Sequence, residues 1–402
     1  MEIIYNHIFV PIITYACGSW GWAVRKVHIK RKLITAQRSA LIHISRAYRT
    51  TSNTALHVLS KKAPIDKCIS LQEKIWHLRW GYNIQSTGNT IYHQDLECAV
   101  HFAHTKHPSS PHNLNFLPSD FTDIEIFTDG SKNTTSVGSG YVAYHNNNEI
   151  ASGQYRLGTD CTVLQAEMIA IQMAVAWADS NFTHRSIDII SDSASSIALL
   201  KKRSHHLIST IIHDTIDNSS NSYHILWTRA HQGTPGNERA DALARTAGEN
   251  GNLPITYNQL TIKTIKTILW KDLIISWQQD WDTYNHPTMH DFIPNIEHFL
   301  NSRWYRPGQR ISQFLTNHGS FHSYLKRFIN KPNPNCSICG VMDGSQHYIY
   351  DCPMLELERF QLKTTIEAHC GTWPIDCDKI FDNKDTYEAF MTLINNYFVR
   401  TT

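Results

Sequence analysis

The sequence lacks a long uninterrupted apolar run. Its most apolar stretch, at about residues 8–24, is broken by Pro11, Gly18 and Gly21, whereas a membrane-spanning helix needs about 20 predominantly apolar residues. The amino terminus also lacks the basic segment that opens a secretory signal peptide. These absences argue against a membrane protein and a secreted one, and they predict an intracellular protein of the cytoplasm or nucleus.

Cysteines are few and follow no pairing pattern. The 402-residue chain has nine, an odd number, and without a secretory leader this argues against a disulfide framework. Six show no spacing typical of a site, and we expect these to be free thiols: Cys17, Cys68, Cys98, Cys161, Cys370 and Cys377. With 41% apolar and 18% charged residues, the chain is neither disordered nor a coiled coil.

The net charge is small, at +2, but it is unevenly distributed. Residues 1–80 hold thirteen Lys and Arg against three acids, a net +10, whereas residues 124–249 hold nine against thirteen, a net −4. The first region suits a polyanion such as a nucleic-acid backbone, and the second is rich in carboxylates.

Changes in composition and periodicity divide the chain into five predicted segments. They are a basic helical segment at 1–83, a linker at 84–120, an α/β domain at 121–249, a helical connector at 250–330, and a cysteine-bearing segment with a helical tail at 331–402. In the third segment the apolar pattern predicts the order β-β-β-α-β-α-β-α. This order indicates a three-layer α/β fold with mixed strand pairing.

Four acids of the α/β segment occur where the fold could bring them together. Asp129 and Asp192 each end an apolar strand, Glu167 is expected in the first turn of a helix, and Asp241 lies in the last helix. Strand ends of an α/β sheet place such residues in one crevice. Clustered carboxylates need a counter-charge, and Mg²⁺ or Mn²⁺ fits because hard oxygen ligands suit these ions better than zinc. Taken singly, each acid could equally be an ordinary turn or cap residue.

Four motifs surround these acids in a fixed order. They are TDGS at 128–131, LQAEMIAI at 164–171, SDS at 191–193 and WTRAHQGTPGNERADALA at 227–244. Together they resemble type 1 ribonuclease H, and more closely the version carried by non-LTR, LINE-type (jockey-like) retrotransposons. The resemblance implies a ribonuclease H-like fold with a mixed five-stranded sheet.

The resemblance also implies roles for single residues. The ligands of two Mg²⁺ ions, with Mn²⁺ as a substitute, fall on the four acids Asp129, Glu167, Asp192 and Asp241. The family's mobile histidine, which handles the attacking water or releases product, falls on His231.

Positions near the RNA strand or the histidine loop fall on Gly130, Ser131 and Asn237. Cellular enzymes carry amide side chains just before the helix acid, whereas this chain has Val163 and Leu164 there, with Gln165 as the nearest amide. This departure leaves recognition of the RNA 2′-hydroxyls more to backbone contacts.

The basic amino-terminal segment has a resemblance of its own. Its stretches PIITYACGSWGWA and LITAQRSALIHISRAYRTTSNTALHVL resemble the thumb-like helices that follow the polymerase palm in the same retrotransposons. The polymerase motif Tyr-x-Asp-Asp is missing from the chain. We therefore expect a carboxy-terminal piece of such a polyprotein, or a truncated copy.

A Cys/His cluster near the carboxyl end has spacing typical of a zinc site. It reads Cys336-x2-Cys339-x7-His347-x4-Cys352, and a closed four-ligand Zn²⁺ site of this kind is structural. The resemblance to zinc knuckles implies a grip on single-stranded nucleic acid, with Tyr348 or Tyr350 stacking on bases. The alternative is a chance cluster of ligand residues.

Two functions follow from these observations. The first is an endoribonuclease that hydrolyses the RNA strand of RNA–DNA hybrids by two-metal-ion catalysis. The alternative is a catalytically inactive, nucleic-acid-binding remnant of a truncated element. The partners expected are an RNA–DNA hybrid and single-stranded nucleic acid, with no membrane, and the sequence leaves the oligomeric state open.

Overall fold

The computed structural model describes the chain in two compact units. One consists of Met1–His77 together with Leu269–Thr402, and the other is Leu78–Ile268. The residues described are all those of the chain except 102, 104–112, 120, 203–204, 230–232, 331, 370, 375 and 402. Each unit has its own architecture.

A mixed seven-stranded sheet forms the centre of the unit Leu78–Ile268, with the strand order β3-β8-β7-β4-β5-β6-β9. Its strands are β3 (Leu114–Asn115), β4 (Ile124–Lys132), β5 (Val137–His145), β6 (Asn148–Leu157), β7 (Ser186–Ser191), β8 (Ser222–Trp227) and β9 (Ile255–Tyr257). Strands β4, β5 and β6 pair antiparallel, whereas β4, β7 and β8 pair parallel.

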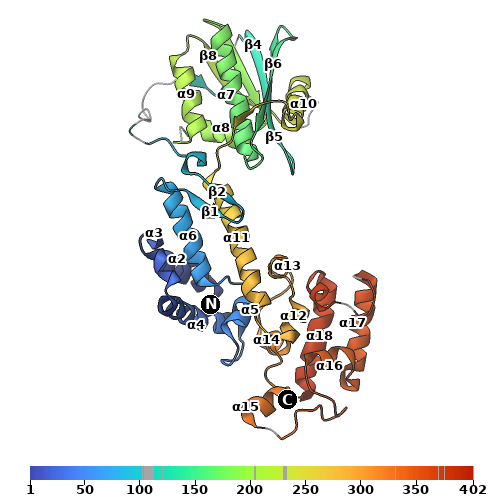
Figure 1. Cartoon of the computed structure of the whole chain (residues 1–402). Coiled ribbons are helices and arrows are strands. Elements are labelled where there is room, and N and C mark those ends of the chain that lie inside the picture. The colour runs from blue at the N-terminus through green and yellow to red at the C-terminus, as the bar shows by residue number, and fades with distance from the viewer. Residues whose placement is uncertain are drawn as a thin grey trace. The chain divides into compact units, whose positions relative to one another are not determined.

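Helices cover both faces of this sheet (Figure 1). They are α7 (Val163–Asn181), α8 (Ala194–Lys201), α9 (Leu207–Asn218) and α10 (Pro235–Glu249). Helices α7, α8 and α9 lie on one face, and α10 lies on the other. The main core fills the space under α7, where Ile126 of β4 and Ile189 of β7 pack with Ile169. This is the three-layer plan that the alternating and helical apolar patterns predict.

Local signals set the helix starts. Thr162 caps α7 in a capping box, in which its hydroxyl accepts from the Gln165 amide and the Gln165 side chain accepts from the Thr162 amide. Pro235 opens α10, at a position where its missing N–H costs no hydrogen bond.

Three features of this unit differ from the sequence prediction. The sheet has seven strands rather than five, because the short strands β3 and β9 extend its two edges. The predicted linker contributes β3, which pairs with β8, and a small hairpin of β1 (Ile84–Ser86) and β2 (Asn89–Ile91). Two helices, α8 and α9, separate β7 from β8 where one was predicted. Short edge strands carry too little periodic pattern to be recognised from sequence.

The second unit is helical. Its amino-terminal elements are α1 (Glu2–Ile4), η1 (Tyr5–Phe9), α2 (Val10–Thr14), α3 (Cys17–Trp20), η2 (Gly21–Arg25), α4 (Val27–Ser45), α5 (Asn53–Leu59) and α6 (Ile65–Arg79). Its carboxy-terminal elements are α11 (Ile262–Asp282), α12 (Pro287–Phe292), α13 (Ile296–Asn301), α14 (Gln309–Thr316), α15 (His322–Ile329), α16 (Ser345–Tyr350), η5 (Pro353–Leu355), α17 (Glu356–His369), η6 (Cys377–Phe381) and α18 (Lys384–Thr401).

The amino-terminal and carboxy-terminal parts of the chain pack together in this helical unit. The Tyr305 hydroxyl donates to the Leu59 carbonyl at 2.9 Å, and the Ser312 hydroxyl donates to the Ser45 carbonyl at 2.7 Å, all within buried surroundings. The compact units therefore divide the chain differently from the five predicted segments. The amino-terminal helices form buried hydrogen bonds with residues more than 200 positions away, which local patterns cannot reveal.

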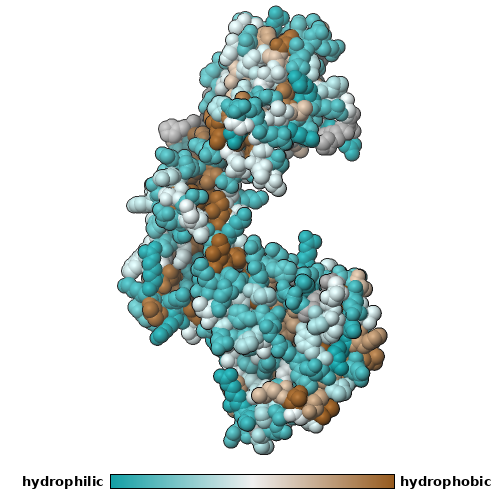
Figure 2. Space-filling model, turned by 45° about the vertical axis from the view of Figure 1, so that its right-hand side comes forward, coloured by the Kyte–Doolittle hydropathy of each residue, from teal (hydrophilic) through white to brown (hydrophobic). Residues whose placement is uncertain are grey.

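Exposed apolar side chains form several small groups among hydrophilic ones on the face drawn in Figure 2. Among the described residues, no helix combines the length and the apolar character that crossing a bilayer requires.

Helix α10 approaches the sheet closely because β5 carries glycines beneath it. A Cβ atom on Gly140 would lie 2.7 Å from the Ala244 amide nitrogen, and one on Gly138 would overlap the backbone of Ala244 and Gly248. The nearest atoms of α10 at both positions are backbone atoms, which cannot rotate out of the way. A side chain on either glycine must therefore push the helix outward. The position of α10, and of the acid it carries, depends on these two glycines.

We therefore predict that Gly138→Ala destabilises the chain by about 1–3 kcal/mol, the usual cost of overpacking a close contact. Urea unfolding followed by circular dichroism measures the change. Gly251→Ala is the matched control, because a Cβ atom there meets no atom within 4 Å. Equal unfolding midpoints for the two variants would contradict the close approach of α10.

Candidate functional site

Two aspartates lie side by side at neighbouring strands. Strands β4 and β7 are parallel, with Thr128 opposite Ser191, so the next residues, Asp129 and Asp192, meet at the same edge. Asp192 follows the end of β7, as expected. Asp129, predicted to end its strand, instead lies inside β4, because β4 continues to Lys132 in its pairing with β5.

Glu167 reaches the same place from α7. Helix α7 begins at Val163, so Glu167 stands in its second turn rather than the predicted first. A Cβ atom on Gly130 would overlap the backbone of Glu167, and the missing side chain therefore lets α7 pass close to β4. This close approach brings the Glu167 carboxylate to the two aspartates.

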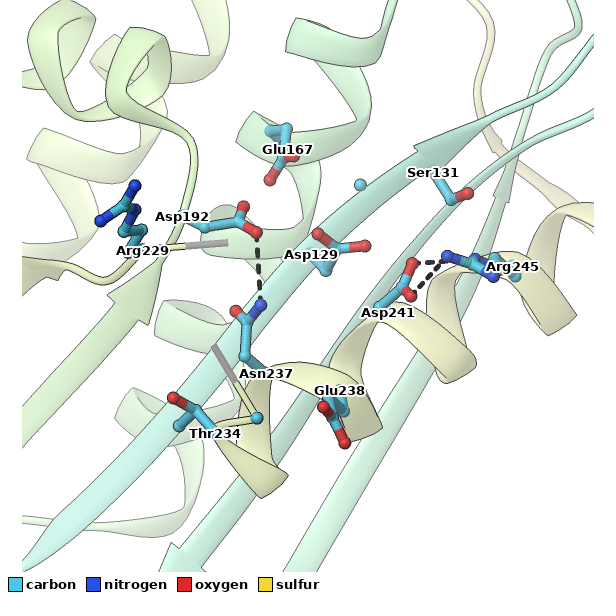
Figure 3. A pocket seen from close by; sticks show the side chains of 12 residues that line it. Asp129, Ser131, Glu167, Asp192, Arg229, Thr234, Asn237, Glu238, Asp241 and Arg245 are labelled. Atoms are coloured by element: carbon cyan, nitrogen blue, oxygen red, sulfur yellow. Dashed lines mark hydrogen bonds and ion pairs between the residues drawn. The ribbon is translucent and has the colours of Figure 1, made fainter. Parts of the chain in front are cut away.

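Carboxylate oxygens of Asp129, Glu167 and Asp192 all lie within 4.8 Å of one another and face the same pocket (Figure 3). Asp129 and Glu167 are buried, at 8% and 6% exposure. Oε2 of Glu167 is buried without a hydrogen-bond partner. An unpartnered buried carboxylate oxygen costs free energy, and a cation at this position would remove that cost.

Burial and mutual repulsion shift the pKa values of these acids. Burial, followed by the charges of Asp192 and Asp241, raises the pKa of Asp129 to about 7. Burial, followed by the charges of Asp129 and Asp192, raises the pKa of Glu167 to about 9. Without a counter-charge the cluster therefore resists full ionisation at neutral pH.

Asp241 lies on α10 but outside this group of three. Its carboxylate is held by Arg245 one helical turn later, with Nε–Oδ1 at 3.0 Å and the terminal guanidinium nitrogen–Oδ2 at 2.7 Å. Figure 3 shows the pair beside Asp129 at the pocket wall. The structure thus brings three of the four predicted acids together and gives the fourth an arginine partner.

The other predicted contact residues are placed differently from one another. Asn237 is buried and donates from its amide to Oδ2 of Asp192 at 3.2 Å, and Gly130 and Ser131 also line the pocket. Gln165 does not line the pocket, because its buried amide serves the capping box of α7 and donates to the Gln259 carbonyl at 3.0 Å. His231 lies outside the described residues.

Sequence reasoning missed several residues that line the pocket. They are Arg229, Gly233, Thr234, Glu238 and Arg245. Only Arg245 had a usable signal, because an arginine four residues after an acid on a helix is placed to pair with it. Arg229, Gly233 and Thr234 come from the segment between β8 and α10, where no periodic pattern operates, and Glu238 lies in the first turn of α10.

The donor set suits a hard divalent cation. Among the described residues three carboxylate oxygens converge, without a nitrogen or sulfur donor, and oxygen ligands are what Mg²⁺ and Mn²⁺ prefer. Two such ions at an acidic site can activate a water and stabilise a leaving oxygen in phosphodiester hydrolysis.

A second cluster of ligand residues lies in the helical unit. Ligand atoms of Cys336, Cys339, His347 and Cys352 all lie within 4.8 Å of one another. The Cys352 sulfur is 4.0 Å from that of Cys336 and 3.7 Å from that of Cys339. Both ring nitrogens of His347 are buried without a hydrogen-bond partner.

The tyrosines next to this cluster are not free to stack on bases. Tyr348 is buried, with its ring 4.5 Å from that of Tyr397. Tyr350 packs on Trp373 and contacts the Cys377 sulfur through its hydroxyl. The predicted base stacking by Tyr348 is therefore wrong, because its ring belongs to the core of the helical unit.

The raised pKa values predict a pH dependence of stability without added divalent ions. The pKa of Glu167 is about 9 in the folded chain and near 4.5 when unfolded, and that of Asp129 is about 7 against 3.8. Between these values the folded state holds protons that the unfolded state releases, so the free energy of unfolding should fall as pH rises from about 5 to about 9.

Urea unfolding at several pH values tests this, and Glu167→Gln should flatten the dependence. The exposed Glu125 provides the control, since Glu125→Gln should leave the slope as in the wild type. An unchanged slope in Glu167→Gln would show that repulsion in the cluster does not act on stability.

Comparisons with known proteins find relatives of the α/β unit and of part of the chain. Residues 122–249 match the RNase H family. A Pol polyprotein of the type-1 retrotransposable element R1 4 from Nasonia vitripennis is 29% identical over 94 residues, which is 23% of this chain and 24% of that protein. The R1 Pol polyprotein from Popillia japonica is 27% identical over 93 residues, 23% of this chain and 36% of that protein.

A putative 115 kDa protein in the R1DM element of Drosophila melanogaster is 26% identical over 95 residues, 24% of this chain and 9% of that protein. The alignments thus cover only about a tenth to a third of these relatives. The RNase H domain at residues 122–249 and the homology to R1 Pol polyproteins together support a LINE-type retrotransposon polyprotein with an RNase H domain.

Proposed function

We propose that the domain is an endoribonuclease that hydrolyses the RNA strand of RNA–DNA hybrids with two Mg²⁺ ions. The observation that carries the proposal is the convergence of Asp129, Glu167 and Asp192 within 4.8 Å. The orphaned Oε2 of Glu167 supports it, since a cation would partner this atom. Membership of the RNase H family, whose members use divalent metals and bind RNA–DNA hybrids, supports the substrate.

Each residue has a part in this proposal. Asp129 stands between Asp192 and Asp241 and is suited to touch both ions, which would activate water and stabilise the leaving oxygen when bound. Asn237 holds the Asp192 carboxylate in place through its amide. Asp241, now paired with Arg245, would complete the ligand set once freed from that pair. His231 would handle the proton of the attacking water or the release of product.

Substrate contacts are proposed mainly at backbone. Gly130 and Ser131 line the pocket at β4, where the RNA phosphate would approach. At the start of α7 the side chain of Val163 is exposed, at 47%, and it offers no hydrogen bond to a 2′-hydroxyl. The backbone must therefore supply much of the discrimination between RNA and DNA.

The alternative remains a catalytically inactive nucleic-acid-binding remnant. The Asp241–Arg245 pair favours it, because an arginine already satisfies the fourth acid. The intact trio of acids, of which Asp129 and Glu167 are buried, favours the nuclease, because nothing in a binding remnant would offset the free energy that burying them costs. Hydrolysis of a hybrid decides between the two.

We predict that the wild-type chain cleaves the RNA strand of a labelled hybrid in Mg²⁺, and that Asp129→Asn lowers the rate by at least a hundredfold. Losing this charge should cost several kcal/mol of transition-state stabilisation, and each 1.36 kcal/mol is tenfold. Asp214→Asn, at an exposed position of α9, is the control and should cleave like wild type. If Asp129→Asn cleaves the hybrid at a rate within about tenfold of the wild-type rate, Asp129 is not a metal ligand.

We also propose that Cys336, Cys339, His347 and Cys352 hold a structural Zn²⁺ ion. Tetrahedral zinc with bonds of about 2.3 Å separates its sulfur ligands by about 3.8 Å, close to the 3.7 and 4.0 Å found here. The two unpartnered nitrogens of the buried His347 ring support the proposal further. With four protein ligands the site is closed, so the ion stabilises the fold rather than reacting.

Elemental analysis should find about one zinc per purified chain, and Cys336→Ser should lower this content because a closed site needs all four ligands. Cys98→Ser replaces an exposed free cysteine and should keep the metal. If the protein is purified without chelators and still contains no zinc, the four residues form a chance grouping and not a zinc site.

A further inference from the structure

An aromatic surface lies in the helical unit and includes none of the residues of the two ligand clusters. Four rings form it: Tyr48, His318, Tyr324 and Phe328. The Tyr324 ring is the centre, with its centroid 5.7 Å from Tyr48, 4.6 Å from His318 and 4.6 Å from Phe328. We call these four residues the ring surface.

The ring surface is partly open to solvent. Tyr48 is 40% exposed and Phe328 46% exposed. The pocket beside them is lined by polar, cationic and aromatic side chains such as Asn317, Arg327 and Phe328, and none of its described lining residues is acidic. A row of aromatic side chains in a closed core would be ordinary packing, but two of these rings show much of their surface to water.

Hydrogen bonds hold the inner rings in place. The Tyr324 hydroxyl lies 2.9 Å from the Thr50 hydroxyl, and Nδ1 of His318 lies 3.2 Å from the Thr51 hydroxyl. Burial lowers the pKa of His318 to about 4, so its imidazole is an uncharged ring at neutral pH. The inner rings thus form a fixed support for the two exposed rings.

Cations flank the exposed rings in the sequence. Arg46 and Arg49 stand on either side of Tyr48, and Lys326 and Arg327 precede Phe328. All four side chains are exposed, and in the described part of the chain none forms an ion pair. The Arg327 guanidinium lies over the Phe328 ring, 5.3 Å from its centroid.

We propose that the ring surface binds single-stranded nucleic acid, with unpaired bases stacking on Tyr48 and Phe328 and the neighbouring cations meeting the phosphates. Exposed rings beside cations that form no ion pair with the described residues match this ligand, because stacking needs only the face of a base and cations bind the phosphate backbone. A duplex hides its base faces, and an acidic peptide offers none. The site is separate from the nuclease pocket and needs neither Mg²⁺ nor hydrolysis.

Fluorescence anisotropy with the full chain and a labelled oligothymidylate of about twelve nucleotides tests the proposal, without added Mg²⁺. Phe328→Leu keeps an apolar side chain of similar size but removes the ring, and it should weaken binding at least about fivefold. Phe328→Trp should restore binding. Phe360→Ala, at an exposed position of α17, is the control and should bind like wild type.

The contribution of the cations to binding is measured from the salt dependence of the affinity for the oligonucleotide. Arg49→Gln should lower the slope of affinity against salt concentration, because one phosphate contact is lost. Asp129→Asn should bind the oligonucleotide like wild type, which separates this site from the nuclease. Unchanged binding in Phe328→Leu, or equal competition by polyglutamate or by a blunt duplex, would overturn the proposal.

Discussion

Repulsion among buried carboxylates is the constraint on which the α/β unit depends. Asp129 and Glu167 are removed from water and lie against Asp192, so burial and like charge both oppose their ionisation. Placing three acids in one pocket lowers the stability of the fold when no cation is bound. The close contacts at Gly130 and Gly140 favour this arrangement, because they let α7 approach β4, which carries Asp129, and let α10 approach the neighbouring strand β5.

Much of the site was predictable because it follows from strand order. Asp129 and Asp192 meet because β4 and β7 are parallel neighbours, and this neighbour relation is what the α/β pattern indicates. Residue roles came from the motifs around the acids rather than from periodicity. The alternating pattern likewise located the strands and helices of the sheet, but not the short edge strands β3 and β9.

Other features depend on contacts that no local pattern shows. From the sequence, the side-chain amide of Gln165 could either face a substrate or cap its own helix. The structure shows the cap, because Gln165 is hydrogen-bonded to Thr162 and to the Gln259 carbonyl. Tyr348 could stack on a base until Tyr397, far along the chain, is seen to cover it. The grouping of the two chain ends into one helical unit depends on hydrogen bonds between residues more than 200 positions apart.

The helical unit carries two candidate binding sites of its own. Its Cys/His cluster and its ring surface lie in one compact unit with the basic amino-terminal helices. The Ser345 amide donates to Asn317, so the start of the helix that carries His347 is tied to the turn beside His318. The two proposals together give the chain two separate places that would bind nucleic acid, the acid pocket and the ring surface.

Calorimetric titration of Mg²⁺ into the full chain tests most directly whether the three acids form a metal site. The wild type should show saturable binding, and Asp192→Asn should remove most of it, because the substitution takes one charge from the cluster while keeping the side-chain shape. Identical heats for the wild type and Asp192→Asn would contradict a metal site in this pocket.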